Sequence, residues 1–98
     1  MERAIALRRL RSISVDIKRL GAKSLYLFGS TARNEATACS DIDLFIDVAH
    51  PKKFSLIELT TLRLFISHAL REPIHLTTRS SLKPYLRQHI EQSSIKVF

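Results

Sequence analysis

Ninety-eight residues, of which 45% are hydrophobic and 26% charged, suit one small globular domain and are too apolar for a disordered chain. The apolar runs of about four residues fall far short of the ~20 that a membrane-spanning helix needs, so we expect no membrane segment. The arginine-rich N-terminus is unlike a secretory signal, and Cys39 has no second cysteine to pair with. We therefore expect a single domain over residues 1–98 in the reducing cytoplasm.

The net charge of +7 is concentrated in the first quarter of the chain. Residues 1–23 hold seven lysines and arginines against Glu2 and Asp16, and so carry +5 of the total. A basic stretch of this kind can contact nucleic acid or an acidic protein surface. It can equally be the solvated face of a helix, because neither interleaved aromatic residues nor a known DNA-binding motif supports the nucleic-acid interpretation.

The start of the chain predicts a helix followed by a buried strand. Over residues 2–20 apolar side chains recur at helical spacing (Ala6, Leu10, Ile13, Ile17 and Leu20). Gly21 follows where a left-handed residue would end the helix. The apolar and aromatic segment 24–28 stops at Gly29, which is typical of a buried strand that ends in a tight turn. A short helix and then a loop are expected over residues 30–40.

Residues 41–47 alternate between acidic and apolar side chains and predict a second strand. Asp41, Asp43 and Asp47 share one face of this strand, whereas the other face is aliphatic. Acidic residues are depleted in strands, so three of them on one face require an explanation.

A capping-box pattern marks the start of a helix over residues 55–70. The Ser55 side chain can accept a hydrogen bond from the backbone of the first turn, while Glu58 reaches back to the backbone of Ser55. The stripe of this helix that is expected to face the core comprises Leu59, Leu62, Phe65, Ile66, Ala69 and Leu70.

Pro73 ends that helix and opens a third strand over residues 74–77. A last helix is expected over residues 82–92, after Ser81 and with Pro84 in its first turn. Strands separated by helices indicate an α/β or α+β sheet with helices packed on it. Two layers are the natural size for a chain of this length.

The clearest chemical signal pairs Gly29-Ser30 with Asp41-x-Asp43, with ten residues between Ser30 and Asp41. A glycine at the end of a strand lets the backbone approach a ligand, and Ser30 offers a hydroxyl and helix N-terminal amides to a triphosphate. Aspartates two apart on a strand place both carboxylates on one side, about 6–7 Å apart at the backbone. Mg²⁺ binds through one or two carboxylates plus substrate phosphates. The pattern predicts a Mg²⁺–nucleotide site, although a turn and two loop acids can share this spacing by accident.

This pattern resembles the signature of the DNA polymerase β-like nucleotidyltransferase superfamily, and the chain is most similar to its minimal nucleotidyltransferases (MNT proteins). The similarity includes Ala32-Arg33 after the turn and the closing run 77–84. It implies a two-layer α+β nucleotidyltransferase fold, a small mixed β-sheet with helices packed on it. It also implies transfer of AMP from ATP to a hydroxyl, with Asp41 and Asp43 as catalytic residues that hold Mg²⁺.

The resemblance further implies a third carboxylate on a neighbouring strand, and the matching position here is His75. A neutral imidazole can accept a proton near pH 7, so His75 is a candidate general base. Because Mg²⁺ prefers oxygen to imidazole, a histidine at this position also favours a domain that no longer catalyses the transfer. Asp47 lies about 13 Å along the strand from Asp43 and is too far away to replace the missing acid.

Two residues after the Gly-Ser turn complete the expected nucleotide site. Arg33 can contact a phosphate, together with Gly29 and Ser30. Asn34 stands where related sequences often have glycine, and we expect it to stiffen the loop.

Three functions are consistent with these residues. The first is a Mg²⁺-dependent nucleotidyltransferase whose acceptor lies on a partner, since 98 residues leave little room for a substrate domain. In relatives that partner is often a small helical HEPN-type ribonuclease toxin, modified on a tyrosine, with the MNT protein as antitoxin. The second is an antitoxin-like module that neutralises its partner by docking alone, which His75 favours.

The third is a nucleic-acid-binding domain that uses the basic N-terminal helix. The aspartate pair argues against it, because these acids repel phosphates unless a metal is bound. Uncovered apolar surface on so small a chain also predicts a homo- or hetero-oligomer.

Overall fold

The computed structural model describes residues 1–37 and 39–98, which contain one mixed sheet of four strands in the order β3-β2-β1-β4. Strand β1 (Ala22–Phe28) runs antiparallel to β2 (Ile42–Val48) and to β4 (Ile95–Lys96). Strand β2 runs parallel to β3 (Ile74–Thr78), as expected for strands joined by a crossover helix. The small mixed sheet with helices packed on it is the α+β fold expected from the sequence.

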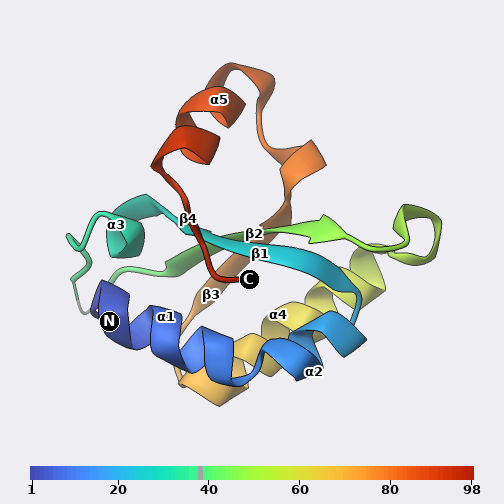
Figure 1. The fold of residues 1–98 in the computed structure, drawn as a ribbon, viewed down its shortest axis with the longest axis horizontal. Helices are drawn as coiled ribbons and strands as arrows, with labels where there is room; N and C mark the ends of the chain where they lie inside the picture. The colour runs from blue at the N-terminus through green and yellow to red at the C-terminus, as the bar shows by residue number, and fades with distance from the viewer. Residues whose placement is uncertain (38) are drawn as a thin grey trace.

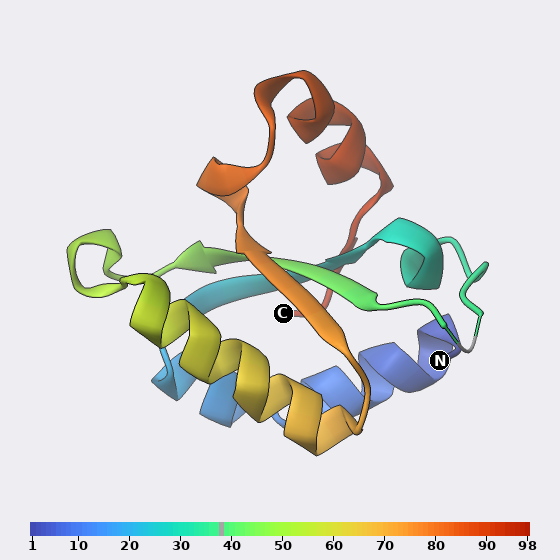
Figure 2. The same ribbon diagram turned by 180° about the vertical axis from the view of Figure 1, so that it is seen from behind.

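Helices cover both faces of the sheet. A layer of α1 (Arg3–Ser12), α2 (Ser14–Arg19) and α4 (Leu56–Leu70) lies on one face, and α5 (Pro84–Ser93) stands over the other (Figures 1 and 2). Short helices in the connections are α3 (Gly29–Ala32), η1 (Pro51–Lys53) and η2 (Arg79–Ser81). Within the described part of the chain, every helix is too short or too polar to span a bilayer.

Strand β2 divides its side chains between the two faces of the sheet, as its alternating sequence predicts. Its aliphatic face is buried in the core shared with the three-helix layer (Ile42, Leu44 and Ile46). Phe45 points to the opposite side, where its ring stacks on Tyr26 with centroids 4.7 Å apart. Asp43 and Asp47 flank Phe45 on that second face, because side chains alternate along a strand.

The N-terminal segment forms two helices, so the prediction of one continuous helix over residues 2–20 is wrong. Ile13 interrupts the helix with φ −111° and ψ 17°, next to Ser12, whose hydroxyl donates to the Arg9 carbonyl at 2.6 Å. Serine side chains that bond back to the preceding turn bend helices. The predicted apolar face is still the packed one, and Gly21 adopts φ +116° after α2 as the sequence suggests.

Three arginines of this basic segment bind backbone carbonyls. Arg3 donates to Ala32 O at 3.3 Å, and Arg9 donates to Leu70 O at the end of α4, also at 3.3 Å. Arg11 donates through Nε to Val97 O at 3.0 Å and through Nη2 to Lys96 O at 3.2 Å. Part of the positive charge therefore holds α3, α4 and the C-terminal strand together.

The sequence predicts no strand after the last helix, yet β4 follows α5 and pairs with β1. Two residues are too few to show the alternation that identifies a strand. The Arg11 guanidinium, which donates to Lys96 O, and the β1 edge supply its partners instead. Helix α5 itself begins at Pro84, two residues later than expected, with the proline in its first turn.

The core stripe predicted for α4 is confirmed except at one position. Leu62, Ile66 and Leu70 are buried, and two more members of the stripe pack partly against the same core (Leu59 and Phe65). Ala69 is exposed. Consecutive helical residues are turned by about 100°, so the residue beside Leu70 points away from the sheet.

The capping box predicted for the start of α4 is also confirmed. Ser55 Oγ accepts the Ile57 N–H at 3.3 Å, while the Glu58 carboxylate accepts from the Ser55 N–H at 3.0 Å and from the Ser55 hydroxyl. The hydrogen bond from the Ser55 side chain is the main reason that the pKa of Glu58 is lowered from its usual 4.5.

The capping box predicts a specific loss of stability in acid. Because the folded state lowers the pKa of Glu58, the cap stabilises the protein above the unfolded pKa, and this contribution disappears as the pH falls through the lower folded value. We therefore expect Glu58→Gln to have a lower Tm than the wild type at neutral pH. The difference between the two Tm values should become smaller below pH 4.5. Thermal unfolding followed by circular dichroism across this range measures the effect. A difference that stays constant in acid would contradict it.

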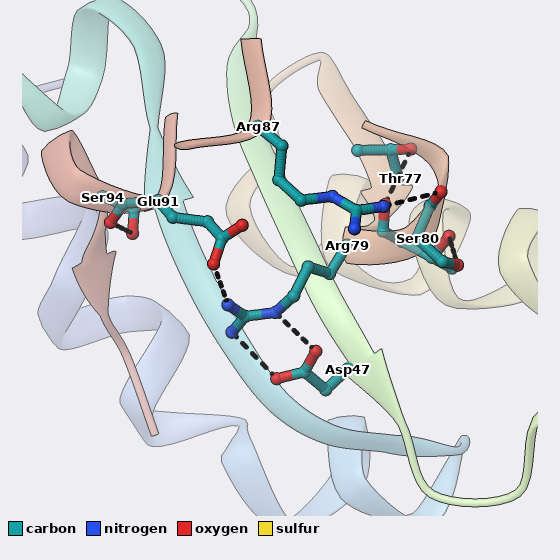
Figure 3. A network of polar contacts seen from close by, with 8 residues as sticks. Asp47, Thr77, Arg79, Ser80, Arg87, Glu91 and Ser94 are labelled. Carbon is teal, nitrogen blue, oxygen red and sulfur yellow. Dashed lines mark hydrogen bonds and ion pairs between the residues drawn. The ribbon is translucent and has the colours of Figure 1, made fainter. Parts of the chain in front are cut away.

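An ion-pair network fastens α5 to the sheet (Figure 3). Arg79 in η2 donates two hydrogen bonds to Asp47 of β2, at 2.8 and 3.0 Å, and one to Glu91 of α5 at 2.7 Å. Its guanidinium also lies over the Tyr26 and Phe45 rings, 4.8 and 5.1 Å from their centroids. The bond to Asp47 raises the pKa of Arg79, which stays charged at every pH of interest. Asp47 is thus occupied by a structural partner.

Replacing Arg79 is expected to destabilise the fold. Arg79→Met leaves Asp47 and Glu91 without a counter-charge in a site where all three side chains are about 30% exposed. A cost of about 2 kcal/mol lies between the values for buried and exposed pairs and lowers Tm by roughly 10 °C in a domain of this size. Calorimetry of the variant and the wild type measures this fall in Tm.

Arg19→Met is the matched control, since it removes an exposed 3.9 Å pair with Asp16. This control is expected to unfold like the wild type. Equal Tm values for the Arg79 and Arg19 variants would contradict a stabilising role for the network.

Candidate active site

The turn that ends β1 requires a glycine for two reasons. Gly29 has φ +72°, a left-handed conformation that other residues rarely adopt. A Cβ atom on Gly29 would also clash with Asp43 Oδ2. The missing side chain therefore lets the Asp43 carboxylate sit directly against the backbone of the turn. Ser30 follows as the second residue of α3 and is partly exposed.

Asp43 also contacts His75, the residue at the position where a third carboxylate was expected. The parallel register of β2 and β3 places the two residues side by side, and His75 Nδ1 lies 3.2 Å from Asp43 Oδ1. An ionised carboxylate only accepts hydrogen bonds, so Nδ1–H donates, and it is the neutral form of this imidazole that has a lone pair on Nε2. The His75 side chain is 62% exposed and that of Asp43 is 29% exposed, so the pair is accessible from solvent.

Asp41 and Arg33 are exposed residues next to the elements that form this cluster, Asp41 before β2 and Arg33 after α3. Asp41 is exposed and directly precedes β2, whose first backbone N–H, that of Ile42, donates to Pro73 O at 3.0 Å. Arg33 Nε donates to Glu35 at 3.2 Å, and both side chains are more than half exposed. Such a surface pair is worth little and is readily exchanged for another anion. The fold thus brings Gly29 and His75 to Asp43 and leaves Arg33 free to reorient.

The loop after the turn explains why asparagine is accepted at position 34. Asn34 has φ +60°, and asparagine is one of the few residues other than glycine that adopt this conformation without a large penalty. Its Oδ1 also accepts the Arg3 N–H at 3.2 Å. The backbone shape expected for glycine is therefore kept, whereas the stiffening of the loop stays a prediction.

The donor atoms of this cluster suit a metal–nucleotide complex. Among the described residues, no three His, Cys, Asp or Glu side chains form a group that could hold a metal ion without help. Two carboxylates are sufficient for Mg²⁺ when phosphate oxygens complete its coordination. Asp43 has accepting capacity left beside its one bond to His75, and the Gly29 turn holds its carboxylate directly against the backbone. Asp41 and Asp43 would hold the ion.

The close contact at Gly29 gives a direct test of this site. Gly29→Ala forces a methyl group against Asp43 Oδ2 and imposes a left-handed conformation that costs about 1–2 kcal/mol, so we expect Tm to fall and Mg²⁺-dependent ATP affinity to drop about tenfold. Isothermal titration with ATP and Mg²⁺ measures the affinity. Gly21→Ala is the control, because its Cβ would meet the Phe54 ring instead. That variant should lose stability but keep its ATP affinity once folded.

A separate cavity opens at the other end of β2. It has a volume of about 720 Å³ and is lined by residues from the end of β2, from η1 and η2, and from the start of α4. Gly29, Asp43 and His75 are not among its lining residues. Asp47 reaches this cavity and not the aspartate–histidine pair, so the third acid of β2 has a different environment from the other two.

Comparison with known proteins identifies the family of this chain. The family model "Nucleotidyltransferase domain" matches residues 7–97. A curated relative from Methanocaldococcus jannaschii, named "Putative protein adenylyltransferase", is 41% identical over 76 residues, which are 76% of each chain. A second protein of the same name from that organism is 38% identical over the same share of both chains.

Solved structures show the same fold. A structure described as a "putative minimal nucleotidyltransferase" has a TM-score of 0.84 and 26% identity, and the match covers 97% of this chain and 95% of the other. A toxin–antitoxin structure with AMP-PNP matches in fold with a TM-score of 0.73 at 21% identity, over 90% of this chain and 72% of the other.

The third solved structure contains a Shewanella oneidensis HEPN toxin, described as tri-AMPylated, in complex with an MNT antitoxin. It has a TM-score of 0.68 at 18% identity and covers 94% of this chain and 71% of the other. With the matched family model spanning nearly the whole chain, this protein belongs to the nucleotidyltransferase domain family and has the fold of its minimal members.

Proposed function

We propose that this protein is a Mg²⁺-dependent nucleotidyltransferase that moves AMP from ATP to a hydroxyl group of a partner protein. The observation that carries the proposal is the position of the Asp43 carboxylate, held between the side-chain-free Gly29 turn and the His75 imidazole. The adenylyltransferase names of the curated relatives support AMP as the group transferred. We also propose that residues 1–98 act as a single domain in the cytoplasm.

Each site residue has a distinct role in this proposal. Gly29 and Ser30 bind the triphosphate through the open turn and the start of α3. Arg33 leaves its exposed pair with Glu35 and contacts a phosphate. Asp41 and Asp43 hold Mg²⁺, which when bound neutralises charge on the phosphate oxygens.

The transfer step needs a base, and we assign this role to His75. The acceptor oxygen attacks the α-phosphorus of ATP, a new phosphorus–oxygen bond forms, and the bond to the departing pyrophosphate breaks. His75 Nε2 takes the proton of the attacking hydroxyl, while Nδ1–H stays bonded to Asp43 Oδ1. The carboxylate fixes the imidazole orientation and stabilises the positive charge that it gains.

For the acceptor we propose a HEPN-type helical protein that this chain neutralises as its antitoxin. The support is a fold shared with the MNT antitoxin of a complex whose HEPN toxin is described as tri-AMPylated. A second candidate is a binding module that neutralises the same partner by docking alone. The imidazole in place of a carboxylate favours this candidate, because it removes an oxygen ligand that Mg²⁺ prefers.

One assay separates the two candidates. The protein is incubated with ATP labelled at the α-phosphate, Mg²⁺ and the purified product of the neighbouring gene, and the label is followed by gel electrophoresis. We expect label on the partner and released pyrophosphate. No transfer, together with no Mg²⁺-dependent ATP binding by calorimetry, would leave docking as the function.

A further inference from the structure

The cavity at the far end of β2 has a mixed basic and apolar lining. Pro51, Phe54, Leu56 and Leu59 form its apolar wall, and Lys23 and Arg87 bring positive charge to it. We refer to these six residues as the basic–apolar groove. Asp47 lines the same cavity and follows Asp43 by four strand residues, a separation of about 13 Å along the strand.

The charge of the groove is not neutralised within the described part of the chain. Arg79 reaches the groove but is paired with Asp47 and Glu91, so these three residues compensate one another (Figure 3). Lys23 is exposed and, among the described residues, neither it nor Arg87 forms an ion pair.

Charged residues next to the groove also contribute to its net charge. Lys52 and Lys53 add exposed charge on η1, next to Pro51. Glu58 is the nearby acid, and its carboxylate is bonded to Ser55. The surface around the groove is therefore net positive.

The apolar rim of the groove is unusually exposed. Leu56 is 76% and its neighbour Ile57 is 77% accessible, at the first turn of α4. Ile57 does not line the cavity, so a small molecule that filled the cavity would leave it in water, whereas adjacent large exposed apolar residues are typical of protein-binding surfaces. A protein segment that covered the rim would remove this apolar area from solvent.

We infer that the basic–apolar groove is the docking surface for an acidic amphipathic helix of a partner protein. The apolar side of such a helix packs on Phe54, Leu56 and Leu59, and its carboxylates face Lys23 and Arg87. The inference relies on the proposed function only for the existence of a protein partner and not for AMP transfer. It places partner recognition apart from the aspartate–histidine pair.

A synthetic helix tests the chemistry of the groove without the natural partner. The probe is a fluorescent peptide of about 18 residues, roughly five helical turns, with leucine along one face and glutamate on the other. A second peptide carries lysine in place of glutamate. We expect the acidic peptide to bind with an affinity that falls as salt rises, and the lysine peptide not to bind. Fluorescence anisotropy measures both.

Matched variants locate the binding site. Leu56→Glu adds an acid to the first turn of α4, and Val15→Glu makes the same change at a 60% exposed position in the first turn of α2. Lys23→Glu is matched by Arg8→Glu on α1, which is also exposed. We expect each groove variant to weaken acidic-peptide binding about tenfold and each control to bind as the wild type does.

The outcomes are distinguishable from failure of the proposed function. Equal binding by groove and control variants would overturn the inference, as would preference for the lysine peptide. A wild-type dimer that the Leu56 variant breaks would assign the groove to a second copy and would also overturn it. If the groove variants lose the peptide while no AMP transfer is found with any partner, the docking surface stands and the enzymatic proposal fails.

Discussion

Asp43→Asn is expected to reduce AMP transfer by about 10³-fold, equivalent to about 4 kcal/mol of transition-state stabilisation. The change keeps the size of the side chain beside Gly29 but removes the charge that would hold Mg²⁺ and stabilise protonated His75. Single-turnover transfer of labelled AMP, with partner in excess, measures the loss. We expect weaker Mg²⁺-dependent ATP binding in the same variant.

Asp47→Asn is the matched control on the same face of the same strand. Asp47 bonds to Arg79 and not to the candidate site, so this variant should lose thermal stability while it retains transfer at a temperature where it is folded. A loss of transfer in the Asp47 variant that equals the loss in the Asp43 variant would contradict the assignment of the site to Gly29, Asp43 and His75.

His75→Gln is expected to lower the rate of transfer by about 10²–10⁴-fold, the usual contribution of a general base. Glutamine can still donate a hydrogen bond to Asp43 but cannot take a proton, so the Kd for ATP should change little. Rapid-quench measurement of the chemical step, beside calorimetry for ATP binding, separates the two effects. His89→Gln on α5 replaces an exposed histidine elsewhere and should have no effect.

A carboxylate at position 75 should restore part of the activity that glutamine removes. His75→Asp provides a group that can take a proton and an oxygen ligand for Mg²⁺ beside Asp43. If the glutamine variant transfers AMP at the wild-type rate, His75 is not the base. If the wild type is inactive and only His75→Asp transfers AMP, the natural protein is the docking module and its imidazole is the reason.

The local signals in the sequence were strong where one short segment contained the whole physical cause. The capping box of Ser55 and Glu58 needs only residues within one turn, and it forms as predicted. The alternation along β2 is similarly local and correctly assigned Ile42, Leu44 and Ile46 to one core. The break at Ile13 was missed because a continuous apolar face hides the competition between the Ser12 hydroxyl and the helix backbone.

Features that depend on distant residues were missed or left open. Strand β4 is held by Arg11 and by β1, far away in the sequence, and two residues carry no periodicity of their own. Arg79 lies in the closing run that resembles the family, but its partners Asp47 and Glu91 come from a strand and a helix that only the fold brings together.

The Gly29-Ser30 turn and the Asp41-x-Asp43 spacing were sufficient to indicate the family and to propose the residues of a nucleotide site, because ligand chemistry restricts which residue types can serve there. The tertiary structure decided how those residues relate to one another. The parallel register of β2 and β3 sets His75 against Asp43, and the turn brings Gly29 within contact of the same carboxylate. It also separated Asp47 from that cluster. Four residues of extended strand place the Asp47 side chain too far away to contact the site, and it pairs with Arg79 instead.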